Sequence, residues 1–256
     1  MKKVLNNLLI ACVLLTATST QATIITVFDG VAAGEINFES AVAGAGGTSV
    51  VSLWENSISG SIYDFGDYTL QNVDGAFISS TSSNNTSGNY MVSIDPIGST
   101  GSGRAAPEDY INGGIKLVFD DPINAIGFEV EDWATCCFEP TTDLYISFDG
   151  GTPILVASGN NNSDGLFPSK SNVNISVYEI FVAAFDDSGS FTEVVFWGNG
   201  SGEVLYAGGQ VRYALLDQGS LPPNEVSEPS GIALLSLFLM GMTYRGTKRN
   251  TVKIKN

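Results

Sequence analysis

Histidine is absent from the 256 residues of this chain, and positively charged residues are scarce. Without histidine, neither a Ser-His-Asp triad nor a Cys-His nucleophile can be assembled, and no imidazole can serve as a general base. A zinc site would need carboxylates to complete its ligand set. The commonest hydrolase designs are therefore excluded, and Asp and Glu remain as the candidates for acid–base chemistry.

The few basic residues lie mostly at the two ends of the chain. There are 11 Lys and Arg residues against 27 Asp and Glu residues. Residues 23–224 hold four of the basic and 25 of the acidic residues, so this segment has a net charge of −21. Such a surface repels DNA, RNA and anionic lipid, which excludes a nucleic-acid role. It is typical of a protein kept soluble outside the cell, and it also favours cation uptake.

Cysteine is equally sparse. Cys12 lies in an N-terminal apolar run, and the other two cysteines, Cys136 and Cys137, are neighbours in the sequence. Neighbouring α-carbons lie about 3.8 Å apart, which is shorter than the usual disulfide span, so a vicinal disulfide would need a strained peptide. A vicinal bridge, two free thiols and intermolecular bridging all remain open.

The N-terminus has the layout of a secretory signal peptide. Lys2 and Lys3 precede an apolar run over residues 8–17, and small and polar residues follow up to Ala22. We predict a signal peptide at residues 1–22 with cleavage after Ala22. A retained N-terminal anchor is the alternative, but the run is shorter than the ~20 apolar residues of a spanning helix.

Residues 23–217 have the composition of a β domain. Gly, Ser, Asn and Asp form turn-like clusters between segments rich in Val, Ile, Phe and Tyr, and no segment shows helical periodicity. This pattern predicts an all-β, two-sheet antiparallel β-sandwich of jelly-roll-like type, followed by a linker at residues 218–226. The expected strands are residues 23–28, 67–73, 76–80, 90–94, 115–119, 126–131, 144–148, 154–157, 175–185, 191–197 and 203–213.

Two pairs of these strands carry turn signals between them. Asp120, Asp121 and Pro122 separate residues 115–119 from residues 126–131, which predicts two antiparallel strands joined by an Asp-Pro turn. The sequence Asp149-Gly150-Gly151 separates the next two strands and predicts a β-hairpin.

Glu129 and Glu131 are the candidate catalytic pair. They alternate with Ile126, Phe128 and Val130, so the two carboxylates share one face of the expected strand, about 6.5 Å apart. The spacing resembles the Glu-x-Asp-x-x-Glu strand of laminarinase-like glycoside hydrolases, although Ala134 stands where the third carboxylate of that motif would fall. We favour the simpler interpretation, an exposed acidic face on a half-buried strand.

Acidic turns could bind calcium. Hard cations take six to eight oxygen ligands, and turns supply carboxylates, amides and backbone carbonyls. No turn matches an EF-hand loop, and ordinary turn chemistry explains the same residues, so no cofactor is required and a structural calcium ion is only an option. The candidate ligands are Asp120, Asp121, Asp164, Asp186 and Asp187.

Tryptophan side chains are the natural stacking surfaces for a sugar. Trp54, Trp133 and Trp197 could serve in this way. Single aromatic residues in β-strands are more often core or cross-strand partners, which is the interpretation that we prefer.

The C-terminal residues have three parts in a fixed order. Ser227, Glu228 and Pro229 come first, an uncharged segment at residues 230–244 follows, and Arg245, Lys248 and Arg249 close the pattern. This order resembles the PEP-CTERM sorting signal of Gram-negative bacteria, with Ser227 in place of the family's first Pro. We assign the sorting signal to residues 227–250, a transmembrane helix to about 230–244, and a basic cytoplasmic end to residues 251–256.

The resemblance implies a route. PEP-CTERM proteins are exported, held transiently in the inner membrane by the tail, processed by exosortase, and released to the cell surface or an exopolysaccharide matrix. The leading hypothesis is a non-catalytic surface or matrix protein that binds carbohydrate or is adhesive, with exosortase, the secretion machinery and polysaccharide as partners. A carboxylate-dependent glycan-degrading enzyme using Glu129 and Glu131 is the alternative, and an inert matrix filler is a third.

Overall fold

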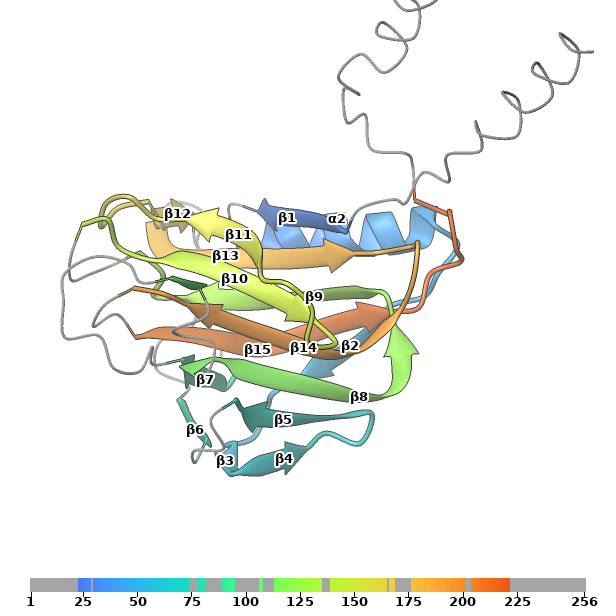
Figure 1. Cartoon of the computed structure of the whole chain (residues 1–256), viewed down its shortest axis with the longest axis horizontal. Helices are drawn as coiled ribbons and strands as arrows, with labels where there is room; N and C mark the ends of the chain where they lie inside the picture. Colours follow the sequence, from blue (N-terminus) through green and yellow to red (C-terminus); the bar gives the residue numbers. More distant parts are fainter. Residues whose placement is uncertain are drawn as a thin grey trace, which may run out of the picture. The chain divides into compact units, whose positions relative to one another are not determined.

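The structure is a computed structural model, and it describes residues 23–28, 30–73, 78–81, 89–94, 106–107, 113–134, 139–164, 166–168, 176–200 and 204–221. These residues form two antiparallel β-sheets and one α-helix (Figure 1). The expected two-sheet antiparallel architecture is confirmed.

Nine strands form the larger sheet. In spatial order, its main path is β1 (Ile24–Phe28), β13 (Ser176–Phe185), β9 (Ala125–Glu131), β15 (Leu205–Ala214), β7 (Met91–Ile94), β6 (Ile78–Thr81) and β3 (Ser59–Gly60). Two short strands lie off this path: β12 (Leu166–Pro168) pairs with β13, and β2 (Val50–Leu53) pairs with β15.

Six strands form the smaller sheet. In spatial order they are β11 (Ile154–Ser158), β10 (Asp143–Phe148), β14 (Phe191–Gly198), β8 (Ile115–Ile123), β5 (Tyr68–Asn72) and β4 (Ile62–Asp64). Every strand expected from the sequence has a counterpart in one of the two sheets. The short strands β2, β3, β4 and β12 were not expected.

The turn after β10 is confirmed as a hairpin. Asp149 and Gly150 both have positive φ, 48° and 69°, as a type I′ turn requires. The N–H of Gly151 donates to the carbonyl of Phe148 at 2.8 Å, and β10 pairs with β11 in antiparallel register. The Asp149 carboxylate also accepts hydrogen bonds from the N–H groups of Thr192 and Glu193, which fixes the turn against β14.

The expected hairpin around Asp120, Asp121 and Pro122 is wrong. Strand β8 belongs to the smaller sheet and β9 to the larger one, so the chain crosses between the sheets here. The three residues are exposed and form an irregularity in the pairing of β8 with β14. Asn124 anchors the crossing, because its side-chain amide donates to the carbonyl of Leu216 and its side-chain oxygen accepts from the Leu216 N–H.

The main hydrophobic core lies between the two sheets. From the larger sheet, Ile126, Phe128 and Val130 of β9 point into it, as the alternation predicted. Phe128 meets Phe196 of the smaller sheet edge to face, with ring centroids 5.0 Å apart. Burial of these side chains is the main force that holds the sheets together.

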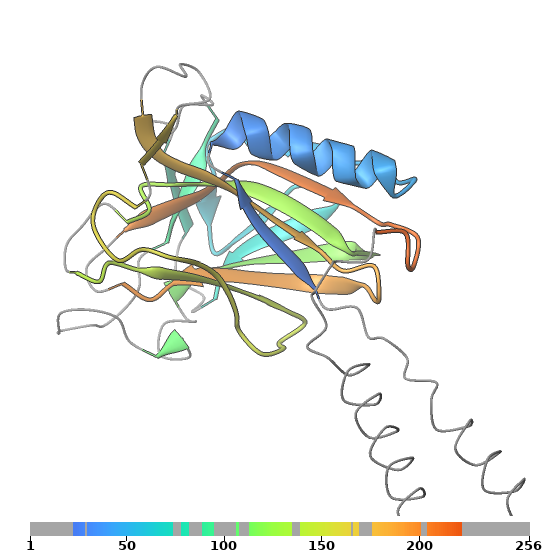
Figure 2. The same cartoon turned by 90° about the horizontal axis from the view of Figure 1, so that it is seen from above.

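A helix, α2 (Val31–Gly44), covers the other face of the larger sheet, and the expectation that the domain contains no helix is wrong (Figure 2). Its buried positions are Val31, Gly34, Phe38 and Val42, which follow helical spacing. The helix ends in a turn where Gly46 adopts a φ of 76° and the Gly47 N–H donates to the Val42 carbonyl at 2.9 Å. The domain therefore has a third layer.

Two glycines allow the helix to approach the sheet closely. A Cβ atom on Gly34 would overlap the Phe181 side chain of β13. A Cβ atom on Gly127 of β9 would lie 2.6 Å from the Phe181 ring and 3.0 Å from Phe38. Phe38 also stacks on Phe185 at 5.3 Å, so this second apolar cluster needs the small residues at both positions.

Candidate functional site

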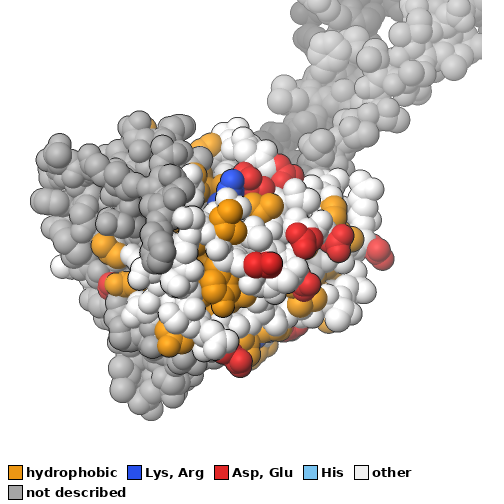
Figure 3. Space-filling view, turned by 90° about the horizontal axis from the view of Figure 1, so that it is seen from below, with side chains coloured by type: hydrophobic (Ala, Val, Ile, Leu, Met, Phe, Trp, Pro, Cys, Tyr) orange, Lys and Arg blue, Asp and Glu red, His pale blue; other side chains and the backbone are white. Residues whose placement is uncertain are grey.

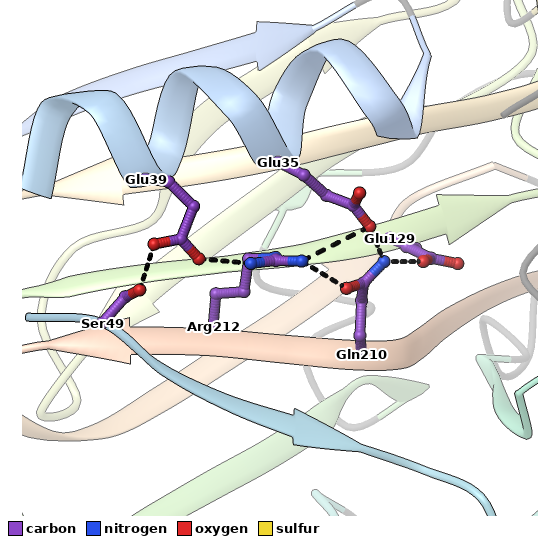
Figure 4. A network of polar contacts seen from close by, with 6 residues as sticks. All are labelled: Glu35, Glu39, Ser49, Glu129, Gln210 and Arg212. Atoms are coloured by element: carbon purple, nitrogen blue, oxygen red, sulfur yellow. Dashed lines mark hydrogen bonds and ion pairs between the residues drawn. The ribbon is translucent and has the colours of Figure 1, made fainter.

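Glu129 and Glu131 lie on the outer face of β9, as the alternation predicted, but that face is not exposed. Glu129 has 0% of its surface exposed and Glu131 has 4%. The expectation of an exposed acidic face is wrong, because it assumed that only two layers exist. Glu129 instead takes part in a polar network of charged groups beneath α2 (Figure 4).

Gln210 is the centre of this network. It comes from β15, and its side-chain amide nitrogen donates hydrogen bonds to the carboxylates of Glu129 on β9 and Glu35 on α2. One amide group therefore joins two strands of the sheet and the helix. Gln210 is only 1% exposed, so these bonds form away from water.

Arg212 supplies the positive charge. Its Nη1 donates to Glu39 of α2, while its Nη2 donates to the side-chain oxygen of Gln210 at 2.9 Å and lies 3.6 Å from Glu35. Ser49, just before β2, donates its hydroxyl hydrogen to the other oxygen of Glu39. Figure 4 shows the guanidinium lying between the two helix carboxylates, which come from successive turns of α2.

Carboxylates outnumber positive charges in the network described above. Among these contacts, the carboxylates of Glu35, Glu39 and Glu129 meet the guanidinium of Arg212 and the amide of Gln210. The Arg212 side chain is 13% exposed and that of Glu35 is 16% exposed, so this ion pair lies in a poorly hydrated place. These contacts join α2 to strands β9 and β15 and so stabilise the packing of the helix on the sheet. Glu129 has none of its surface exposed, so the carboxylate is not reached from solvent in this arrangement.

A further acidic residue lies next to Glu131. In the antiparallel register, Glu131 of β9 is opposite Glu179 of β13 on one side and Tyr206 of β15 on the other. Glu179 is 0% exposed. Carboxylates on directly opposite residues of neighbouring strands repel when both are charged, so this edge of the sheet is the second place where buried acids gather.

The structure places the calcium candidates in separate turns. Asp120 and Asp121 are exposed, and Asp164 accepts hydrogen bonds from the backbone of Asn160 and Asn161. The Asp186 carboxylate accepts a hydrogen bond from the Ser188 N–H in the turn after β13. The Asp187 carboxylate accepts from the Leu221 N–H at 2.6 Å. Within the described ranges, no group of three or more Cys, Asp and Glu residues is placed to hold a metal ion.

The tryptophans belong to the protein interior. Trp54, Trp133 and Trp197 are 1%, 4% and 0% exposed, so the preferred interpretation of these residues as core or cross-strand partners is confirmed. Trp54 donates its indole N–H to the Tyr68 hydroxyl at 2.8 Å, and Tyr68 donates in turn to the Ser52 hydroxyl. Burial raises the pKa of the Tyr68 hydroxyl well above its ordinary value.

Several predicted features lie outside the described residues. They are the signal peptide at residues 1–22, the cysteines Cys136 and Cys137, and the whole sorting signal, including Ser227, Glu228, Pro229, Arg245, Lys248 and Arg249. Within the part of the chain that the structure describes, no helix is long and apolar enough to cross a membrane.

No protein-family model matches the chain, and no curated protein matches it in sequence. The site must therefore be interpreted from its own geometry.

Most members of the network were not identified from the sequence. A signal for the helix was present, since Val31, Gly34, Phe38 and Val42 recur at intervals of three and four residues. Glu35 and Glu39 each follow one of these buried positions by one residue, which places them together at the margin of the buried stripe. Gln210 and Arg212 alternate with Val211 and Tyr213 on β15, which places both on the outer face of the sheet.

Proposed function

We propose that this protein is an exported, non-catalytic component of the cell surface or of an exopolysaccharide matrix, whose β-sandwich binds carbohydrate or is adhesive. Its C-terminal segment would be the PEP-CTERM-like signal read by exosortase, with a transient stay in the inner membrane through an apolar helix at about residues 230–244. The jelly-roll-like type of the sandwich belongs to the same proposal. Its support is the order of the terminal motifs and the net charge of −21 between them.

One structural observation favours the non-catalytic form of this proposal. Glu129, which would be a catalytic carboxylate in the alternative, is fully buried and bonded to Gln210 beneath α2. A glycosidase needs both carboxylates within reach of the glycosidic oxygen and of water. Here the first carboxylate of the pair contributes to the attachment of the helix, so the observation argues against hydrolysis by Glu129 and Glu131.

Polysaccharide binding can be measured on residues 23–221, after near-ultraviolet circular dichroism has established a fixed tertiary structure. The protein is applied to an immobilised polysaccharide panel, with calcium and with chelator, and both retention and release of reducing ends are scored. We expect retention on at least one polysaccharide and no release. Retention that is lost with chelator would add a calcium ion to the proposal.

The variant Glu129→Gln separates the two functions. It keeps the shape of the side chain and removes the charge, so we expect unchanged retention and no hydrolysis before or after the change. Release of reducing ends that disappears in Glu129→Gln would establish the enzymatic alternative. Absence of both binding and release in every condition would leave only the inert filler.

The sorting part of the proposal has its own test. In a Gram-negative host that carries exosortase, Glu228→Ala should leave an unprocessed precursor in the inner membrane, whereas Glu225→Ala, a matched change outside the motif, should be processed and released. Equal release of both variants would refute sorting through this segment, whatever the domain binds.

A further inference from the structure

Strand β2 leaves one edge of the larger sheet open. Its residues pair with β15 in antiparallel register, with Ser52 opposite Val211 and Val51 opposite Arg212. Among the described residues, β15 is its only partner strand. Val50, Val51 and Leu53 are 43%, 42% and 46% exposed, so three of the four residues of this strand are large apolar side chains in contact with water.

The hydrogen-bonding direction of each β2 residue follows from one contact. The N–H of Trp54 donates to the Gly209 carbonyl of β15 at 3.0 Å. Because the polar groups of successive residues alternate in direction along a strand, those of Ser52 also point towards β15, and those of Val51 and Leu53 point away from it. An unpaired row of this kind is a template for another strand.

Charge distinguishes this edge from the rest of the surface. Acidic side chains are scattered over the face shown in Figure 3, and basic ones are scarce there. In contrast, the sequence from Ser40 to Trp54 has no charged residue, in a chain with a net charge of −16. A second copy of this acidic chain is repelled by the net charge, and β2 itself brings no charged side chain to a contact between two copies.

The sequence of β2 is also complementary to itself. If two copies of β2 run antiparallel about a two-fold axis at Ser52, Val51 of each copy lies opposite Leu53 of the other. The outward N–H and C=O groups of Val51 and Leu53 are then the ones that pair across the axis, and their side chains form apolar cross-strand pairs. A symmetric contact of this type closes on itself.

We propose that β2 is a self-association edge, through which two copies of this protein join their larger sheets into one continuous sheet about a two-fold axis at Ser52. The inference is independent of whether the domain binds carbohydrate. A four-residue edge is a small interface, so the contact is weak in dilute solution and becomes significant where copies are crowded.

Disulfide cross-linking of the full-length chain in mild detergent tests the register. In the proposed dimer, the two Ser52 residues form a non-hydrogen-bonded pair with α-carbons about 4.5 Å apart, within the range of a disulfide. The two Val51 residues lie about 7–8 Å apart, too far for one. After copper-phenanthroline oxidation, Ser52→Cys should give a covalent dimer above the background of the native cysteines, and Val51→Cys should not.

Charge substitutions test the edge itself. In the Ser52→Cys background, Leu53→Lys should abolish the cross-link, because it places two lysines across the axis next to Val51. Leu155→Lys is the matched control, since Leu155 is 51% exposed on β11, at the edge of the other sheet. It should leave the cross-link unchanged. No dimer above background, or a dimer that survives Leu53→Lys, would overturn the proposal.

A second measurement avoids the cysteine variant, because Ser52→Cys removes the hydroxyl that Tyr68 contacts. Sedimentation velocity of the otherwise unaltered chain, in density-matched detergent, should show a concentration-dependent dimer that Leu53→Lys removes and Leu155→Lys retains. A monomer at every concentration reached, or equal loss in both variants, would refute self-association through β2.

Discussion

Replacing Gly34 with alanine should reduce the stability of the domain, although alanine is the better helix former. In the interior of a helix, Gly→Ala contributes about 1 kcal/mol of stability. At Gly34, however, the new methyl group would overlap Phe181, so α2 must withdraw from the sheet or Phe181 must shift. Overpacking of this kind costs about 1–3 kcal/mol, and the cost should be near the upper limit because Phe181 is fully buried. We expect a net loss of about 1–2 kcal/mol.

Gly44 provides the matched control on the same helix. A Cβ atom at Gly44 meets no atom within 4 Å, so Gly44→Ala gains helix propensity without overlap and should raise the free energy of unfolding by up to about 1 kcal/mol. Urea denaturation of residues 23–221, followed by tryptophan fluorescence, measures both changes. If Gly34→Ala is as stable as Gly44→Ala, the close approach of α2 to the sheet is not as described and the reasoning fails.

Three further outcomes are expected. Arg212→Met should lower the free energy of unfolding by about 3 kcal/mol, because it removes a largely buried guanidinium that pairs with Glu35 and Glu39. Lys116→Met, which breaks a 3.5 Å pair with Glu193 near the surface, should cost less than about 1 kcal/mol. Equal losses in urea denaturation would contradict the buried network. Burial raises the pKa of both Tyr68 and Tyr213. Above about pH 10 the unfolded chain loses these two protons and the folded protein keeps them. The free energy of unfolding should therefore fall as the pH rises beyond that value. Absorbance titration at 295 nm should show two fewer ordinary tyrosine ionisations in the folded protein than in the unfolded chain, and the same number as in a folded Tyr68→Phe, Tyr213→Phe variant. Ordinary ionisation of both tyrosines in the folded protein would refute this. Finally, the Ser52→Cys cross-link should increase with salt, because each copy carries a net charge of −16, and a decrease would argue against an uncharged strip between like-charged molecules.

The strands were predictable because their signal is local. Alternation at Ile126, Phe128 and Val130 identified both β9 and its core face. The hairpin at Asp149 and Gly150 was predictable because a type I′ turn requires residues that tolerate positive φ.

The location of a strand in one sheet or the other is not a local property. The Asp120-Asp121-Pro122 signal correctly marked an interruption, but a turn signal does not determine whether the next strand pairs with the previous one or crosses to the facing sheet. The crossing depends on Asn124, whose side chain bonds to Leu216, 92 residues later. No short-range pattern contains that contact.

The third layer explains the errors about the site. Helix α2 has a partly buried alanine, Ala41, and exposed alanines, and exposed Ile36 adds to its outer surface, so its apolar face differs little in composition from its open face. Without that helix, Glu129 and Glu131 had to be assigned to solvent. The burial of Glu129 follows from a packing partner that is almost one hundred residues away in the sequence.

The pairing of β1 has a consequence for the order of folding. Ile24 is opposite Phe185 in the register, 161 residues later in the sequence. Strand β1 therefore cannot pair until that later part of the chain is present. Helix α2 also depends on β13, because its Gly34 packs against Phe181 of that strand. Closing so long a loop is slow. The pairing of β1 and the packing of α2 against β13 therefore form only after β13 has been made, and a chain cut before Ser176 would lack the strand on which both elements assemble.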